Sequence, residues 1–198
     1  MTSPDALPGP APSGRAGPVG PVGVSEEPVS EVSLPSPVGT ASSQWAIQNL
    51  IAAYAELVDA GDFAGLGALL ADATFTGSGP PVSGSAAIEA MFRDMLIVYA
   101  DGTPQTPQTP NTPQTRQTPR TSHVTTNIAI AVDEEAGTAV ARSYFTVLQA
   151  LPDLPLQSIA SGRYHDRFER GGGQWRFAAR RATVVLVGDV SRHLRHAR

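Results

Sequence analysis

His123 is the first residue to consider for acid–base chemistry, because an imidazole titrates near neutral pH and is the usual general acid or base. Tyr54 and Asp59 are further candidates in an apolar stretch. They are five residues apart, a rotation of about 140° on an ideal helix, so spacing alone does not place them in one pocket. Each residue also has a purely structural interpretation: a core tyrosine, an aspartate bonded locally at a helix end, and a strand histidine facing solvent.

The first half of the chain predicts three helices. Apolar residues at helical spacing favour a helix over residues 45–60, with Ser42 or Ser43 as its cap and Gly61 after its end. Tyr54 lies on the inward stripe of this helix. Asp62 is expected to cap a short second helix, a short strand covers residues 73–76, and a third helix covers residues 85–99.

The last third predicts four strands, at residues 122–132, 138–149, 157–170 and 174–187, with turn signals between them. Alternation puts His123 on one strand face with Thr125 and Asn127, opposite Val124, Ile128 and the later apolar residues. Three helices followed by such a meander predict an α+β fold, in which a cone-shaped, curved, mostly antiparallel sheet wraps around the helices and encloses a pocket.

Composition divides the chain into parts. Residues 1–41 are rich in Pro, Gly and Ser and are expected to be disordered, and residues 42–189 form the domain. A Thr-Pro-Gln repeat at residues 101–121 predicts a mobile insert without a fold of its own. Residues 190–198 are a basic C-terminal tail, expected to be solvated or frayed.

Composition also excludes several classes of function. The chain has no Cys and no Lys, which excludes disulfides, thiol nucleophiles and Schiff-base chemistry. Its net charge of −4 argues against nucleic-acid binding, and no apolar run is long enough to span a membrane, so we expect a cytoplasmic protein. Within the fold no two His stand at ligand spacing and no Gly-rich loop opens a helix, so we expect no metal and no cofactor.

Three segments resemble a known family. They are YAELVDAGDFAGLGALLADATF (Tyr54 to Phe75), SHVTTN (Ser122 to Asn127) and GRYHDRFERGGGQWRFAARR (Gly162 to Arg181). The chain is similar to the SnoaL-like group of the nuclear transport factor 2-like superfamily, and resembles ketosteroid isomerase, scytalone dehydratase and bile acid dehydratase. The dehydratase resemblance implies a Tyr that contacts substrate, an Asp that orients a His, and a strand His, here Tyr54, Asp59 and His123.

The isomerase resemblance adds Asp166, which shares a strand face with Gly162, Tyr164 and Phe168. In those enzymes a carboxylic acid at this position stays protonated and donates to an oxyanion. An ion pair with a nearby Arg, which would keep Asp166 ionised, is the alternative. The isomerases also take a base from a short-strand Asp, where this chain has Gly77 preceded by Thr76, so an isomerase mechanism lacks its base unless His123 supplies one.

These observations predict a cofactor-independent dehydratase or cyclase acting on a hydrophobic, oxygenated ring compound such as a polyketide or steroid-like metabolite. The alternatives are an isomerase that uses Tyr54 and Asp166 as an oxyanion clamp, and a binding or assembly module without chemistry. The expected partners are a small-molecule substrate and a second copy of the chain, through the outer face of the sheet, where Phe145, Val147 and Ile159 suggest apolar side chains. The candidate substrate contacts are Asn127, Tyr144, Tyr164, Phe168 and Trp175.

Overall fold

The computed structural model describes residues 40–109, 112 and 116–196. The chain divides into two units, residues 1–34 and 35–198, and all described residues belong to the second. Residues 1–39, for which we predicted disorder, lie outside the described residues, as do 110–111 and 113–115 of the Thr-Pro-Gln insert and 197–198 at the C-terminus.

Three helices form where apolar periodicity predicts them. Helix α1 (Ala41–Ala60) starts earlier than expected, because the side chain of Thr40 accepts a hydrogen bond from the backbone N–H of Ser43; Gly61 ends it with φ 68°. Helix α2 (Phe63–Leu69) is capped by Asp62, as predicted. Helix α3 (Ser85–Met95) stops four residues short of the predicted end, because the chain then extends into strand β3 (Val98–Ala100).

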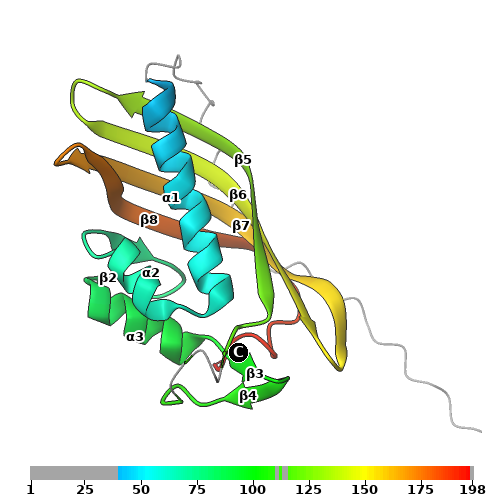
Figure 1. Ribbon diagram of the computed structural model, residues 1–198. Coiled ribbons are helices and arrows are strands. Elements are labelled where there is room, and N and C mark those ends of the chain that lie inside the picture. The colour runs from blue at the N-terminus through cyan, green and yellow to red at the C-terminus, as the bar shows by residue number, and fades with distance from the viewer. Residues whose placement is uncertain (1–39, 110–111, 113–115, 197–198) are drawn as a thin grey trace, which may run out of the picture. The chain divides into compact units, whose positions relative to one another are not determined.

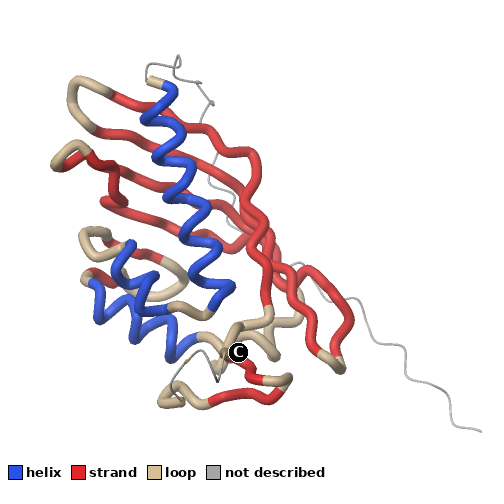
Figure 2. The backbone as a smooth tube through the Cα atoms, viewed as in Figure 1, coloured by secondary structure: helices blue, strands red, loops and turns tan. Residues whose placement is uncertain are grey.

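The main sheet has six strands in the order β2-β1-β8-β7-β6-β5. The strands are β1 (Thr74–Thr76), β2 (Val82–Ser83), β5 (Thr121–Asp133), β6 (Thr138–Leu151), β7 (Leu154–Gly171) and β8 (Gln174–Val187). All neighbours are antiparallel except β1 and β8. Helix α1 lies across one face of the sheet, in contact with β5 and β8 (Figures 1 and 2). The predicted α+β arrangement is confirmed, with a cone-like sheet that does not close on itself.

The apolar core lies between the inner face of the sheet and the helices, and it contains residues that we had assigned to the outer face. Phe145, Val147 and Ile159 are all buried in this core, so that assignment is wrong. Alternation alone shows that two faces exist but does not say which one faces the helices. The exposed apolar side chains on the strands are instead Val124, Val140, Tyr144, Leu156, Val184, Val185, Leu186 and Val187.

A β-bulge interrupts strand β5 after His123. The register with β6 shifts between Thr126 and Ala129, and Asn127 has a positive φ of 52°. The extra residue reverses the alternation, so that His123 and Thr125 face inward before the bulge and Ile128 after it. Asn127 is exposed and does not share an inward face with His123, contrary to the prediction from simple alternation.

The insert has structure in its described parts, which the Thr-Pro-Gln repeat did not predict. Strand β4 (Thr103–Gln105) pairs with β3, and Pro104 lies opposite Tyr99. The backbone N–H and carbonyl of Tyr99 both form hydrogen bonds with Thr118 on the other side, at 2.8 and 3.2 Å. Tyr99 therefore needs no hydrogen bond from Pro104, which has no N–H to donate.

The described part of the C-terminal segment is also packed rather than solvated. Leu194 forms an antiparallel bridge with Leu96 at the end of α3, and His193 is buried. The expectation of a frayed tail is therefore wrong for residues 190–195, because their backbone groups find partners on the domain. None of the described helices is both long and apolar enough to cross a membrane.

Candidate active site

Asp59 and His123 meet where the last turn of α1 reaches the start of β5. The Asp59 Oδ1 atom lies 2.6 Å from Nδ1 of His123, and its Oδ2 accepts the backbone N–H of the same residue at 2.7 Å. The hydroxyl of Thr121 donates a third hydrogen bond to Oδ1, at 2.8 Å. Two residues on one strand face therefore fix the carboxylate, and the carboxylate fixes both the backbone and the ring of His123.

The contacts of Asp59 favour its ionised form. Burial by itself raises the pKa of Asp59, but the hydrogen bonds and positive charge of His123, together with Thr121, outweigh it and hold this pKa below its ordinary value. An ionised carboxylate only accepts hydrogen bonds, so the proton of a neutral His123 ring sits on Nδ1. Nε2 then carries the lone pair and can take a proton, while Asp59 stabilises the resulting imidazolium.

Tyr54 lies deeper, in an aromatic and charged cluster. Its ring meets that of Tyr164 edge to face, with the centroids 5.7 Å apart, and the guanidinium of Arg180 stands 4.0 Å from the ring centre of Tyr54 and 4.2 Å from that of Tyr164. Burial raises the pKa of Tyr54 to about 12; Arg180 opposes this rise, and the charges of Asp166 and Asp59 add to it. The hydroxyl therefore stays protonated at neutral pH, and it lies within electrostatic reach of Asp59.

Asp166 forms an ion pair with Arg180 in the interior. Arg180 Nε and Nη2 donate to the two carboxylate oxygens at 2.9 and 2.7 Å, and both side chains are completely buried. Of the two interpretations of Asp166, the geometry corresponds to the pairing with Arg. Both oxygens are engaged by one bidentate partner, which leaves Asp166 poorly placed to donate a proton to a substrate oxyanion.

The candidate substrate contacts are divided between several places. Tyr164 lies beside Tyr54, and Phe168 is buried against Phe177. Tyr144 is 44 % exposed on the outer side, with Arg163 over its ring, and Asn127 is exposed at the bulge. Thus Tyr164 joins the site, whereas Tyr144 and Asn127 are not brought to it.

Trp175 lies at the opposite end of the sheet from Asp59. It contacts Arg170, which pairs with Glu134, which in turn accepts hydrogen bonds from Thr40 just before α1. Asp59 stands at the other end of this helix, and twenty residues of helix span about 30 Å. Trp175 is therefore not part of the cluster around His123.

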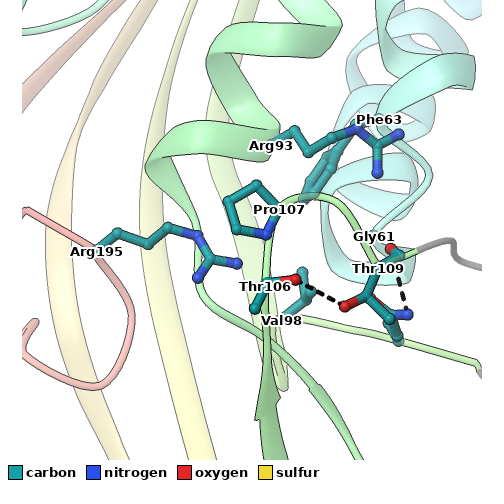
Figure 3. Close-up of a pocket in the computed structure, with 9 residues that line it drawn as sticks. Gly61, Phe63, Arg93, Val98, Thr106, Pro107, Thr109 and Arg195 are labelled. Atoms are coloured by element: carbon teal, nitrogen blue, oxygen red, sulfur yellow. Dashed lines mark hydrogen bonds between the residues drawn. The ribbon is translucent and has the colours of Figure 1, made fainter.

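A small cavity of about 10 Å³ opens just beyond the end of α1, at Gly61 (Figure 3). Such a volume is about that of one water molecule. Its lining comes from the α1–α2 junction, from α3 and β3, from the insert and from the C-terminal segment: Gly61, Phe63, Arg93, Val98, Thr106, Pro107, Thr109, Gln117 and Arg195. This end of the fold is therefore packed by the insert and the C-terminal segment together.

A comparison with models of protein families identifies the family of this chain. The family model described as the SnoaL-like domain matches residues 39–181, well over half of the sequence. The chain belongs to this family. The matched range includes Tyr54, Asp59 and His123 and ends just after Arg180, so the whole C-terminal segment, residues 190–198, lies outside it. Among proteins with curated functional descriptions, none is similar enough to count as a relative.

Solved structures confirm the fold of this SnoaL-like domain. An NTF2-like protein with a cystatin-like fold from Novosphingobium aromaticivorans is 21% identical, with a TM-score of 0.54 over 73% of this chain and 82% of that one. A candidate scytalone dehydratase from the same organism is 20% identical (TM-score 0.55, 79% and 90%). ActVI-ORFA from Streptomyces coelicolor is also 20% identical (TM-score 0.54, 73% and 98%). At these identities the solved structures establish the fold that this chain shares with them.

Sequence reasoning missed three polar residues of this SnoaL-like domain: Thr121, Arg180 and His193. Thr121 was counted as the last residue of the insert. Arg180 follows a register shift near Phe177, so alternation does not single it out from the arginines around it. His193 lies in a segment with no apolar period. Among the described residues, no three His, Asp or Glu side chains are grouped to hold a metal ion.

Proposed function

We propose that this SnoaL-like domain is a cofactor-independent dehydratase or cyclase that acts on a hydrophobic, oxygenated ring compound, with Asp59 and His123 as its acid–base dyad. The observation that carries the proposal is the triple hydrogen bonding of Asp59, at 2.6 to 2.8 Å, to the ring and backbone of His123 and to Thr121. A surface histidine without a function would not be held by both its ring and its backbone N–H to a partly buried carboxylate.

In the proposed elimination, His123 Nε2 takes the proton α to a substrate carbonyl, and the electron pair of that C–H bond moves toward the carbonyl oxygen. The hydroxyl of Tyr54, which burial keeps protonated, donates a hydrogen bond to this oxygen. The imidazolium, stabilised by Asp59, then returns the proton to the β-hydroxyl as its C–O bond breaks. One water leaves, and one imidazole has served first as base and then as acid.

Two other functions are alternatives to the dehydratase or cyclase. An isomerase that uses Asp166 is less favoured, because Arg180 already engages both carboxylate oxygens. A binding module without chemistry is the second alternative, and a larger hollow lined by Gly61, Asp62 and Arg93 at the same end of α1 as the cavity in Figure 3 is compatible with it. Turnover distinguishes these functions from the lyase.

The test is turnover of scytalone and a set of hydroxylated tetralones, followed by absorbance as the ring becomes aromatic. His123→Ala should lower kcat by about two to four orders of magnitude, the usual contribution of a positioned acid–base group. The matched control is His165→Ala, which removes an exposed histidine from the outer face of β7 and should leave turnover unchanged. Equal turnover by wild type and His123→Ala would contradict the dyad, and no turnover of any compound would favour the binding module.

A further inference from the structure

His193 is buried in an unusual way for a histidine near the end of a chain. Its residue exposure is 7 %, and its Nδ1 atom is buried without a hydrogen-bond partner among the described residues. A buried polar atom without a partner costs stability, so such atoms are uncommon in folded proteins. The hydrogen-bonding capacity of this nitrogen is therefore unmet by the part of the chain that the structure describes.

The backbone around His193 is held firmly, which keeps the imidazole in one place. Four hydrogen bonds connect it to α3, β3, β6 and the segment between them: Tyr99 Oη to the Arg192 carbonyl at 2.6 Å, Gln149 Nε2 to the same carbonyl at 3.1 Å, Ile97 N to the His193 carbonyl at 2.8 Å, and Arg195 N to the Met95 carbonyl at 3.0 Å. A ring on a backbone fixed from both sides can present its nitrogen in a defined direction.

His193 is also close to the Asp59–His123 dyad. Thr121, which donates to Asp59, lies directly across the β5–β6 ladder from Gln149, and the Gln149 side chain holds the carbonyl of Arg192. One cross-strand pair therefore links the dyad to the residue before His193. Besides burial, the charge of His123 lowers the pKa of His193, and the charge of Asp59 raises it, which agrees with this link.

We propose that His193 is a substrate-contacting residue of this site, whose Nδ1 forms a hydrogen bond with a hydroxyl or carbonyl oxygen of the ring compound. The inference rests on the proposed function for the class of ligand. A neutral imidazole presents either N–H or a lone pair at Nδ1, and a hydroxyl group can complement both. The C-terminal segment thus supplies a polar contact that strand β5 alone does not provide.

The experiment measures the binding of 1-naphthol and of naphthalene, which lacks the hydroxyl, to the full chain by ligand fluorescence. His193→Phe should weaken 1-naphthol binding about tenfold, the loss expected for one buried hydrogen bond, and leave naphthalene binding unchanged. His193→Asn keeps a polar atom near the position of Nδ1 and should retain most of the affinity. His196→Asn, at an exposed histidine three residues away, is the matched control and should change neither Kd.

Three results would overturn the inference: equal weakening for both ligands, which is the mark of a packing role; no weakening for either; or a wild type that does not prefer 1-naphthol to naphthalene. If His193→Phe does not fold, as judged by circular dichroism, His193→Ala takes its place.

Binding also separates this inference from the proposed function. A preference for 1-naphthol that depends on His193, without turnover of any compound, would contradict the lyase and support the contact. Turnover without that preference would contradict the contact alone.

Discussion

Single residues set the response of this domain to acid, and His193 has the clearest effect. Burial, with a smaller contribution from the charge of His123, lowers the pKa of His193 from 6.5 to about 4. Between these pH values the unfolded chain binds more protons than the folded one, so acid favours unfolding. The share of the unfolding free energy due to His193 should be complete above pH 6.5 and fall by roughly 3 kcal/mol as the pH drops toward 4.

Urea unfolding at pH 7, 5 and 4 checks this prediction. Asp59 also has a lowered pKa and adds a loss of stability at lower pH, so the useful quantity is the difference between wild type and His193→Asn. This difference should shrink as the pH falls, because the variant has no imidazole to protonate. A difference that stays constant from pH 7 to pH 4 would show that His193 titrates normally and is not buried as described.

The ion pair of Asp166 with Arg180 could be predicted only in part from the sequence. The strand pattern placed Asp166 on an inward face, and that face was correct. It could not choose between a protonated acid and an ion pair, because the partner stands fourteen residues away on β8, beyond a register shift. Aromatic rings of Tyr54, Tyr164 and Phe177 around the guanidinium make burial of the charge possible.

At the scale of elements, periodicity predicted the helices and the long strands, because both depend on a regular alternation of apolar side chains. It failed where the alternation is broken. The bulge at Asn127 adds one residue to β5 and changes which side chains face inward, and no single residue type announces it. The pairing of Asp59 with His123 followed from family resemblance rather than from spacing, since the two are sixty-four residues apart.

The packing of the C-terminal segment against the domain could not be predicted from the sequence. The segment has little apolar period, and hydrogen bonds to its backbone groups help to hold it against the domain. Deletion of residues 190–198 should lower the unfolding free energy by roughly 3 kcal/mol, since several hydrogen bonds of about 1 kcal/mol each are lost. Thermal unfolding measures the effect. Ser191→Ala, a small change at an exposed position, is the control, and a deletion no more destabilising than this control would contradict the packing.

At the scale of the whole molecule, exposed apolar side chains predict self-association. Four consecutive exposed residues, Val184 to Val187, end strand β8, and Val140 and Tyr144 are exposed on β6. Successive side chains of a strand point to opposite faces, so Val184 to Val187 do not form one surface. We expect a homodimer formed through the face that carries Leu186, Val140 and Tyr144, rather than through Phe145, Val147 and Ile159. Sedimentation at micromolar concentration should give twice the mass of the chain.

Leu186→Glu tests which surface forms this dimer. Leu186 is largely exposed, so a charge there should dissociate the dimer without unfolding the domain. Val82→Thr, at a half-buried position on β2, offers a control away from the patch and should leave the mass unchanged. A monomeric wild type, or a dimer that persists in Leu186→Glu, would contradict the predicted interface.

The central claim is that Asp59 and His123 act as one unit, and a double-mutant cycle on turnover tests it most directly. Asp59→Asn should slow kcat by about ten- to a hundredfold in wild type, because the imidazole loses its orientation and the stabilisation of its charge. In the His123→Ala background the same change should have almost no effect on kcat, since there is no imidazole left to orient. If the two losses instead multiply, Asp59 and His123 act independently, and the dyad is refuted.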